Sequence, residues 1–322
     1  MQDQETIRIL QIDGGGVKGI IPAIICAEIE KRLDKPIYEI FDLITGTSTG
    51  AVIGGALAMG MCASKLKNFY LNEVVDLFSR PRNTLLPWNW LKSKYDRVKF
   101  QELLIREIGE KSVCDTKTKY MAATFNLCSQ KTHFIKSWDE SDRKWSIVDV
   151  ISWSALSAVY YFGKINVPDY DWTYESPEGD ETEMMGAVFQ DGGQGGNNST
   201  LTFNLMECLA NDYRNVFILS IGTGTNDDRI KYSDASRINL IGQALNFLTQ
   251  ARNESIPNQV AWAKYVDKSR GDDFTVCRLN ASLENKENKL DAYKYASKYE
   301  DIGKRLAEQV PYDKLKPYKI VV

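Results

Sequence analysis

Short apolar runs alternate along this chain with longer amphipathic stretches, and this alternation limits the folds that are open to it. Within the first sixty or so residues, segments 7–13 and 41–47 are typical of buried strands, and each is followed by a helical pattern, at 20–33 and 49–61. A repeated order of strand, turn and helix favours a mostly parallel sheet that is covered by helices. We therefore expect an α/β fold with a mostly parallel central sheet.

The same alternation continues to the end of the chain. Further strand patterns lie at residues 120–126, 132–138, 185–190, 216–221 and 274–279, and further helical patterns at residues 63–78, 98–108, 147–159, 201–212, 238–250 and 291–309. The 322 residues include 43% hydrophobic side chains, which suffices for a sizeable core, and no repeat or clear linker divides them. We expect residues 1–322 to form a single domain.

Glycines directly follow the first expected strand, in the segment DGGGVKG. Gly14, Gly16 and Gly19 fit the pattern G-x-G-x-x-G, which binds dinucleotides when it lies between a strand and a helix. The same backbone N–H groups at a helix N-terminus can instead stabilise the oxyanion of an ester hydrolysis. A dinucleotide site also needs an acidic residue at the end of the second strand, whereas Asp42 lies at its beginning. The loop alone leaves both alternatives open, and the position of Asp42 weakens the first.

Ser48 lies between the second expected strand and its helix, at the centre of GTSTG. In a nucleophile elbow, a serine occupies a tight turn from strand to helix, and small residues are needed two positions before and after it. Gly46 and Gly50 meet this need, and the N-terminus of the following helix would stabilise charge on the attacking oxygen. The flanking patterns favour a nucleophile over an ordinary turn residue at Ser48.

Composition limits the choice of a base for Ser48. The chain has one histidine, His133, so a Ser-His-Asp triad must use it, and the strand pattern around it indicates a surface hairpin. A carboxylate is the alternative, and Asp191 follows a short apolar strand and precedes Gly192 and Gly193. That arrangement puts a side chain at the C-terminal rim of a parallel sheet, where α/β sites occur, although Asp-Gly is also an ordinary turn dipeptide.

The motifs DGGGVKG, GTSTG and DGG occur in this order, and with them the chain resembles the patatin-like phospholipases and lipid acyl hydrolases. The stretches SWSALSAVYYF, at residues 152–162, and ILSIGTG, at residues 218–224, are similar to two further segments of that family. The resemblance covers roughly residues 5–225, and it departs from the family at Val159, where many members have proline. It implies a three-layer α/β/α patatin-like fold.

The resemblance also implies a catalytic Ser/Asp dyad. Matched motif by motif, it makes Ser48 the nucleophile and Asp191 the base, and it assigns the oxyanion hole to Gly14, Gly15 and Gly16. Such a dyad would hydrolyse acyl esters of membrane phospholipids or galactolipids through an acyl-enzyme intermediate. Those steps need no metal, and we expect no cofactor.

Four glycines and one lysine are expected to support these groups. Gly46, Gly50, Gly192 and Gly193 flank the two residues of the dyad. Lys18 stands where the family usually has arginine or lysine after its glycines. We expect Lys18 either to support the glycine loop or to contact a phosphate.

Some bacterial members of the family are compact effectors that degrade membranes in anti-phage defence when a cyclic nucleotide activates them. Residues 226–322 carry no catalytic motif, and by analogy we expect them to hold a regulatory or oligomerising surface. A cyclic-nucleotide activator and a homo-oligomer are therefore hypotheses that rest on the family alone.

The segment TLLPWNWLKSKY, at residues 84–95, has the composition of an interfacial anchor. Trp88 and Trp90 lie among leucines and lysines, so we expect a membrane-facing rim here, although a core-packed loop fits the same composition equally well. The chain has no secretory signal and no apolar run that approaches about 18 residues. We expect a cytoplasmic protein that associates peripherally with membranes.

Charge and cysteine spacing argue against two other classes of protein. The formal charge is −3 without a long run of one sign, which disfavours nucleic acid polymers as partners. The six cysteines are scattered without a C-x-x-C pair, which indicates buried thiols in place of a zinc or redox site. Besides a lipid acyl hydrolase, two functions stay open: a dinucleotide-dependent oxidoreductase that uses residues 14–19, and a catalytically silent lipid-binding module.

Overall fold

The computed structural model describes residues 6–82, 93–176, 178–193, 199–211, 213, 215–225, 257–269 and 274–316. Within these residues, the centre of the fold is a run of parallel strands in the spatial order β3, β2, β1, β7, β8. They are β1 (Ile7–Ile12), β2 (Leu43–Thr47), β3 (Lys119–Asn126), β7 (Val216–Ile221) and β8 (Phe274–Leu279). Every residue of β2 and β7 is buried, because a parallel sheet is covered on both faces.

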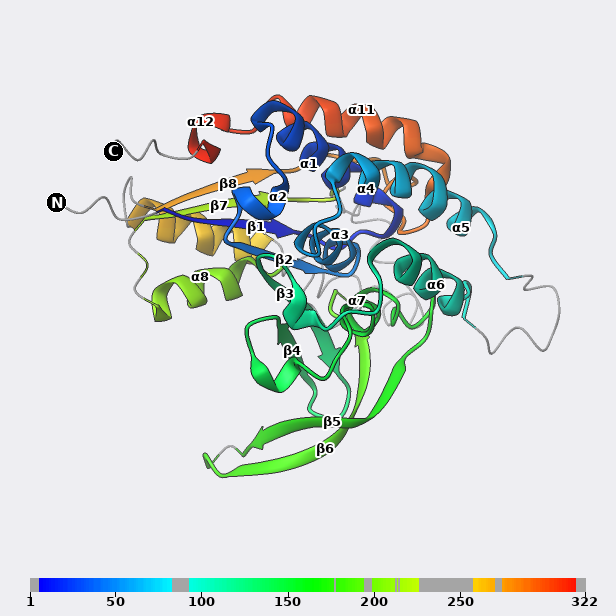
Figure 1. Cartoon of the computed structure of the whole chain (residues 1–322), viewed down its shortest axis with the longest axis vertical. Helices are drawn as coiled ribbons and strands as arrows, with labels where there is room; N and C mark the ends of the chain where they lie inside the picture. The colour runs from blue at the N-terminus through cyan, green and yellow to red at the C-terminus, as the bar shows by residue number, and fades with distance from the viewer. Residues whose placement is uncertain are drawn as a thin grey trace, which may run out of the picture.

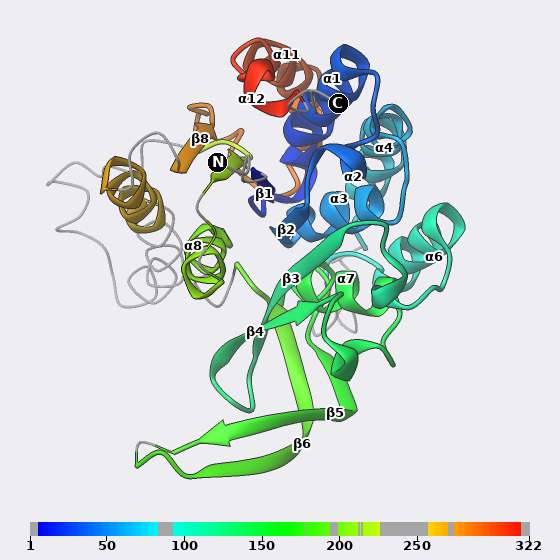
Figure 2. The ribbon, with the colours of Figure 1, turned by 60° about the vertical axis from the view of Figure 1, so that its left-hand side comes forward.

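Helices cover both faces of this sheet, as Figures 1 and 2 show from two directions. On one face lie α1 (Ile20–Leu33), α2 (Ile37–Ile40), α3 (Thr49–Ala58), α4 (Ala63–Phe69), a π-helical turn (Tyr70–Val74), α5 (Val75–Ser79), α6 (Arg97–Ile108), α7 (Ile147–Ala155), α11 (Ala296–Ala307) and α12 (Tyr312–Leu315). On the other lie α8 (Leu201–Ala210) and a helix at residues 257–269. The expected three-layer α/β/α fold with a mostly parallel central sheet is confirmed.

Strand β1 shows how the alternation of side chains builds the two layers. Leu10 and Ile12 belong to the large core under α1 and α3, whereas Ile9 belongs to the smaller core under α8. Successive side chains of a strand point to opposite faces, so a mostly apolar strand can pack against helices on both sides.

Helix α3 fits its central place because its residues are small. All ten residues of its sequence TGAVIGGALA are buried. A Cβ atom on Gly55 would lie 2.7 Å from Cδ1 of Ile151 in α7, so glycine lets the two helices approach closely. The Tyr120 hydroxyl donates a hydrogen bond to the Ala51 carbonyl over 2.9 Å and ties α3 to β3.

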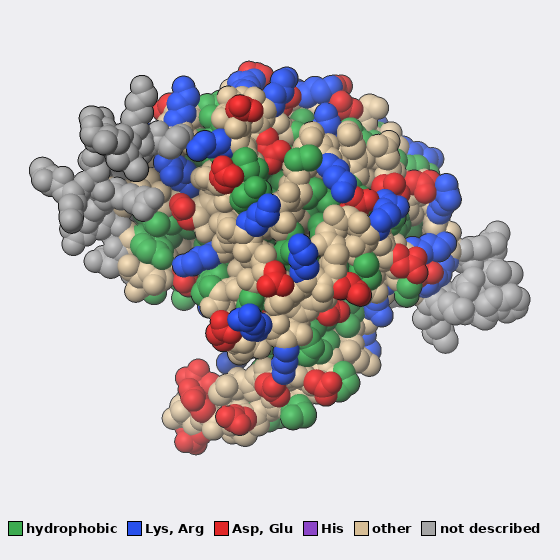
Figure 3. Space-filling model, in the orientation of Figure 1, with side chains coloured by type: hydrophobic (Ala, Val, Ile, Leu, Met, Phe, Trp, Pro, Cys, Tyr) green, Lys and Arg blue, Asp and Glu red, His purple; other side chains and the backbone are tan. Residues whose placement is uncertain are grey.

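A long antiparallel ribbon projects from the sheet, and this part of the fold was not expected. It consists of β5 (Ile165–Glu175) and β6 (Glu181–Asp191), which joins β3 in antiparallel pairing. The prediction of a short strand at 185–190 was wrong in extent, and β5 was missed because it contains Pro168 and several acidic residues, which strands disfavour. Acidic side chains lie over the projecting ribbon (Figure 3).

Residues after 225 add to the same layers. Strand β8 extends the parallel sheet beside β7, and α11 packs along α1. The helical pattern expected at 291–309 is a 3₁₀ turn (Tyr293–Tyr295) followed by α11. The pattern expected at 238–250 lies outside the described residues.

Candidate active site

Strand β3 brings the two candidate catalytic residues to one place. Its residue Thr124 pairs with His133 of β4 (Lys131–Lys136) on one edge and with Asp191 of β6 on the other. Along that second edge, β2 pairs with the residues of β3 that precede Thr124, and it ends at Thr47. β2 and β6 therefore run toward each other along one edge of β3. Ser48 follows Thr47 at the point where they end, and Ser48 and Asp191 line the same pocket.

Ser48 occupies a sharp and strained turn between β2 and α3. Its backbone has φ of 54° and ψ of −124°, a conformation that residues with a side chain rarely adopt. A Cβ atom on Gly46 would lie 2.3 Å from the carbonyl carbon of Gly50, and one on Gly50 would lie 2.1 Å from the oxygen of Ile12. The turn therefore requires glycine at both positions, which is the stereochemistry of a nucleophile elbow.

A second serine fixes this turn from outside it. The hydroxyl of Ser154 in α7 accepts a hydrogen bond from the Ser48 N–H over 3.0 Å and donates one to the Ala123 carbonyl over 2.6 Å. It thereby links the elbow to the middle of β3. Sequence reasoning missed this role, and the only signal was the buried polar pair Ser152 and Ser154 within a mostly apolar helix.

Asp191 ends β6 as a buried carboxylate that is 4% exposed. Its Oδ1 accepts a hydrogen bond from the Gly193 N–H over 2.8 Å, which fixes the side chain in an Asx turn. A Cβ atom on Gly192 would lie 2.7 Å from the Ala123 oxygen, so glycine allows this turn to pack against β3. Asp191 was expected at the C-terminal rim of a parallel sheet; the strand that carries it, β6, is antiparallel to β3 and reaches this rim from the opposite direction.

The glycine loop leads from β1 into a 3₁₀ turn (Gly16–Gly19) and then into α1. Gly16 has φ of 62°, and a Cβ atom on it would lie 2.1 Å from the Leu290 oxygen. Within the described residues, neither the Gly15 nor the Gly16 N–H group donates a hydrogen bond. Gly16 lines the pocket, so its N–H group is available to an oxygen atom there, and Gly15 directly precedes it in the loop.

Two contacts hold the ends of this loop. The Thr223 hydroxyl donates to the Gly14 carbonyl over 2.7 Å, and the Val17 N–H donates to the Leu290 carbonyl over 2.8 Å. Lys18 is fully buried, and its Nζ donates to the carbonyl and to the side-chain oxygen of Asn288, over 3.0 and 2.5 Å. Of the two roles expected for Lys18, these contacts favour support of the loop.

Ser48, Asp191 and Gly16 open onto a narrow pocket, with a cavity of about 30 Å³, whose other walls are largely apolar. These walls are formed by Thr49, Val52, Tyr70, Val74, Phe78, Phe100, Ala155, Leu156, Ala158, Tyr161, Phe162 and Leu290. Burial raises the pKa of the Tyr70 hydroxyl, which therefore stays neutral and hydrogen-bonds Thr49 next to the elbow. Walls of this kind suit an apolar group that lies beside a nucleophile and a carboxylate.

His133 lies away from this pocket, on the opposite edge of β3 from Asp191. Its Nε2 is 2.8 Å from the Ser129 hydroxyl, and its Nδ1 is 3.3 Å from the Tyr170 hydroxyl. Burial, and then the charge of Lys131, lower the pKa of His133, so the ring is neutral near pH 7. These contacts are those of a structural side chain.

The substitution His133→Gln should leave kcat for ester hydrolysis within about threefold of wild type, because a dyad of Ser48 and Asp191 does not use the imidazole. Steady-state hydrolysis of a soluble short-chain ester checks this, with the thermal midpoint recorded to account for any lost packing. A loss of about 10³-fold or more in a folded variant would instead indicate a triad.

The comparisons with known proteins agree with this geometry. The family model described as patatin-like phospholipase matches residues 10–203. The chain belongs to this family. Patatin-like phospholipases are carboxylic ester hydrolases that act through a serine, and the predicted family is confirmed for this chain. The matched residues contain DGGGVKG, GTSTG and DGG, and they end before β7 and β8.

Individual relatives of this patatin-like chain are more distant. A cGAMP-activated phospholipase of Pseudomonas aeruginosa is 31% identical over 163 residues, which are 48% of this chain and 48% of that protein. Patatin-2-Kuras 4 of Solanum tuberosum is 29% identical over 253 residues, covering 70% of this chain and 64% of that protein. The crystal structure of VipD from Legionella pneumophila aligns with a TM-score of 0.44 and 11% identity, over 95% of this chain and 67% of that one. The chain thus spans between about half and two thirds of the length of the curated relatives named here.

The expected membrane anchor at Trp88 and Trp90 lies outside the described residues. Arg82 and Ser93 are the described residues that flank this segment, and Arg82 Nη1 donates a hydrogen bond to the Ser93 hydroxyl over 2.9 Å. Among the described helices, none combines the length and the apolar composition that a bilayer crossing requires.

Proposed function

We propose that this chain is a lipid acyl hydrolase of phospholipase A type, with Ser48 as the nucleophile and Asp191 as the base. One observation carries the proposal: a strained serine on an elbow and a buried carboxylate open onto the same apolar pocket, beside the N–H groups of a glycine loop. A nucleophile, a base, oxyanion donors and an apolar chain site are the groups that acyl transfer needs.

The proposed reaction proceeds in two halves. Asp191 accepts the Ser48 proton while Oγ attacks the ester carbonyl, and the N–H groups of the loop Gly14–Gly16 hold the oxyanion. Collapse of this intermediate breaks the bond between the carbonyl carbon and the alkoxide oxygen, and the lysolipid leaves with the proton from Asp191. Water then attacks the acyl-Ser48 ester while Asp191 accepts its proton, and collapse of the second intermediate breaks the bond to Ser48 Oγ, which takes that proton from Asp191 as the fatty acid leaves.

The apolar walls of the pocket support a long acyl chain as the group transferred. Val52, Val74, Phe78 and Phe100 come from four different elements and present no charge. Each buried methylene of an acyl chain contributes about 0.8 kcal/mol, so such a pocket favours long chains. Analysis by mass spectrometry of phospholipid vesicles incubated with the enzyme tests this: free fatty acid and lysolipid should accumulate together. Vesicles that stay unchanged, although a short-chain ester is cleaved, would restrict the function to a general esterase.

We also propose that the enzyme associates peripherally with the membrane through the outer side of the pocket rim. Val159 and Tyr160 are 49% and 64% exposed, while the next two residues, Tyr161 and Phe162, line the pocket. The Lys94 N–H donates to the Tyr160 carbonyl over 3.1 Å, which attaches this rim to the segment that follows the expected anchor at Trp88 and Trp90. Tyrosine is a residue that membrane interfaces favour.

The double substitution Val159→Ser and Tyr160→Ser should lower the initial rate on phosphatidylcholine–phosphatidylglycerol vesicles by about thirtyfold, since each lost apolar side chain weakens interfacial binding by about 1 kcal/mol. Hydrolysis of a soluble short-chain ester should stay within about twofold of wild type. Tyr174→Ser is the matched control, because Tyr174 is an exposed tyrosine on the projecting ribbon, where acidic side chains do not favour a lipid surface. Equal losses on both substrates would exclude an interfacial role for the rim.

Activation by a cyclic nucleotide, as part of a membrane-degrading anti-phage response, is a further proposal. It rests on the relative from Pseudomonas aeruginosa that is named a cGAMP-activated phospholipase. A panel of cyclic mononucleotides and dinucleotides, including cGAMP, can be added to the vesicle assay. One nucleotide of this panel should raise the rate of vesicle hydrolysis by about tenfold or more. Equal rates of hydrolysis with and without every nucleotide would mean that the enzyme is constitutively active and would contradict this proposal.

A further inference from the structure

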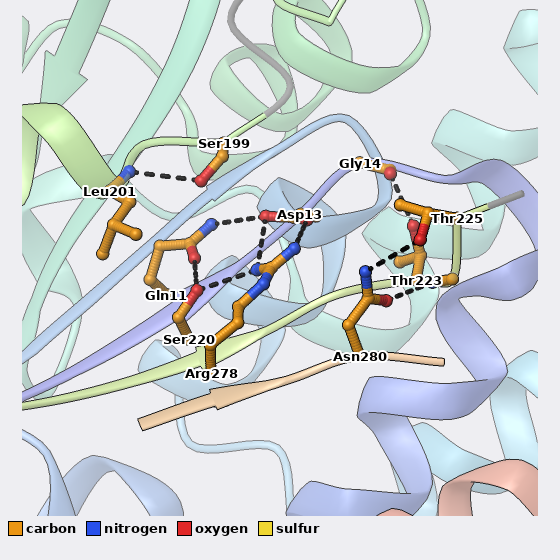
Figure 4. Close-up of polar contacts among 11 residues, drawn as sticks. Gln11, Asp13, Gly14, Ser199, Leu201, Ser220, Thr223, Thr225, Arg278 and Asn280 are labelled. Carbon is orange, nitrogen blue, oxygen red and sulfur yellow. Dashed lines mark hydrogen bonds and ion pairs between the residues drawn. The ribbon is translucent and has the colours of Figure 1, made fainter. Parts of the chain in front are cut away.

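Arg278 connects the C-terminal part of the chain to the candidate active site. It lies on β8, beyond the residues 10–203 that the family model matches, and its guanidinium reaches across β7 to Asp13 (Figure 4). Nη1 donates to Oδ1 over 3.1 Å, and Nη2 pairs with Oδ2. This two-point geometry fixes the orientation of the carboxylate as well as its position.

The ion pair belongs to a closed network of four side chains. The Gln11 amide donates to Asp13 Oδ1 over 2.9 Å, the Ser220 hydroxyl donates to the Gln11 carbonyl oxygen, and Arg278 Nη1 donates to the Ser220 hydroxyl over 2.8 Å. Gln11, Asp13 and Ser220 are almost completely buried. A buried pair of this kind adds little net stability, because desolvation offsets most of the attraction between the charges. The role of this ion pair therefore depends on which residues it holds in place more than on its contribution to the free energy of unfolding.

The ion pair lies at the base of the glycine loop. Asp13 directly precedes Gly14, its own N–H donates to the Ile221 carbonyl over 3.0 Å, and the Gly14 carbonyl accepts from Thr223 over 2.7 Å. The backbone carbonyl oxygen of Asp13 also lies 3.0 Å from where a Cβ atom on Gly50 would be, two residues after Ser48. The carboxylate thus belongs to the residue from which the loop starts, and the N–H groups of this loop would hold the oxyanion.

A lone negative charge at this place would oppose the reaction. The proposed transition state builds negative charge on the carbonyl oxygen, and charges interact strongly where water is excluded. A carboxylate without a partner at Asp13 would raise the free energy of that state relative to the ground state. Arg278 supplies the compensating charge.

We propose that Arg278 is a positioning residue for the glycine loop, which holds Asp13 in place and cancels its charge so that the loop N–H groups act unopposed on the oxyanion. The proposal rests on the hydrolase function proposed for Ser48 and Asp191. It gives the C-terminal part of the chain a role in the chemistry itself, through Arg278, which the motifs of the family do not include.

Two single substitutions separate the effect of charge from the effect of lost contacts. Arg278→Gln and Asp13→Asn both break the ion pair, but the first leaves a buried negative charge and the second a buried positive charge. We expect kcat on a soluble short-chain ester to fall about 100-fold in Arg278→Gln, the scale on which oxyanion stabilisation acts, and by no more than about threefold in Asp13→Asn. The KM of both variants should stay within about twofold of wild type, since the bound ester carries no oxyanion.

The double variant Asp13→Asn with Arg278→Gln removes both charges and should recover kcat to at least about tenfold above that of Arg278→Gln. Equal losses in the two single variants, or no recovery in the double variant, would leave these residues a purely structural role and overturn the proposal. If Arg278→Gln does not fold, the kcat of the double variant tests the proposal without it. A folded double variant whose kcat is about 100-fold below that of wild type would also overturn the proposal. The proposed function fails separately, if wild type cleaves no ester or if Ser48→Ala cleaves it equally well.

Discussion

Replacing Ser48 by alanine should lower kcat for ester hydrolysis by on the order of 10⁴-fold or more, because an enzyme without its nucleophile retains only binding and electrostatic contributions. The change removes one oxygen from a side chain that is 8% exposed, and it leaves the hydrogen bond from the backbone N–H to Ser154 intact. The variant should therefore fold and bind vesicles like wild type. Release of fatty acid from vesicles, with circular dichroism as the control for folding, measures the effect. A folded variant that keeps a tenth of the wild-type rate would exclude Ser48 as the nucleophile.

The substitution Ser48→Gly adds a physical check that does not depend on the reaction. Both variants lack Oγ, but only glycine adopts φ of 54° and ψ of −124° without steric strain. Relief of strain at such a site is worth about 1–3 kcal/mol, and the greater freedom of glycine in the unfolded chain costs about 0.5–1 kcal/mol. The glycine variant should accordingly be about 1 kcal/mol more stable than the alanine variant in urea unfolding. An alanine variant as stable as the glycine variant would mean that the elbow stores no strain.

Local features of the site could be predicted from the sequence because short-range sterics determine them. A serine that joins a buried strand to a helix can have a backbone with positive φ only if its neighbours two positions away leave room, and Gly46 and Gly50 leave that room. The glycines of DGGGVKG likewise follow a strand directly, so their place beside a helix N-terminus follows from the order of the elements.

Long-range pairing could not be predicted in the same way. Asp191 was expected at the rim because it follows an apolar strand, but the pattern carries no sign of strand direction, and β6 reaches the rim antiparallel to β3. Nothing near Ser48 in the sequence indicates that Ser154, 106 residues away, accepts its N–H. The contacts of Arg278 and Leu290 with the glycine loop are of the same kind, since each joins segments more than 260 residues apart. Local periodicity contains no information on such contacts.

Replacing Asp191 by asparagine should lower kcat by about 10⁴-fold, because the carboxamide has nearly the same shape but cannot accept the Ser48 proton. An asparagine side-chain oxygen can still accept the Gly193 N–H hydrogen bond that Asp191 Oδ1 accepts over 2.8 Å, so the turn and the fold should persist. The KM for a soluble ester should change by no more than about threefold, because the carboxylate acts on the proton of the nucleophile and not on the bound ester.

Asp142→Asn is the matched control for this change, since Asp142 is also a buried aspartate and accepts the Lys136 N–H over 2.9 Å, outside the pocket. It should keep kcat within about twofold of wild type. Covalent labelling of Ser48 by a fluorophosphonate separates the remaining alternatives, because labelling also requires an activated serine. Slow labelling in Asp191→Asn, with normal labelling in His133→Gln, is the result expected of a dyad. Fast labelling and turnover in Asp191→Asn would mean that another group activates Ser48. His133 lies on the opposite edge of β3 from Asp191, so that group would have to come from the walls of the pocket itself.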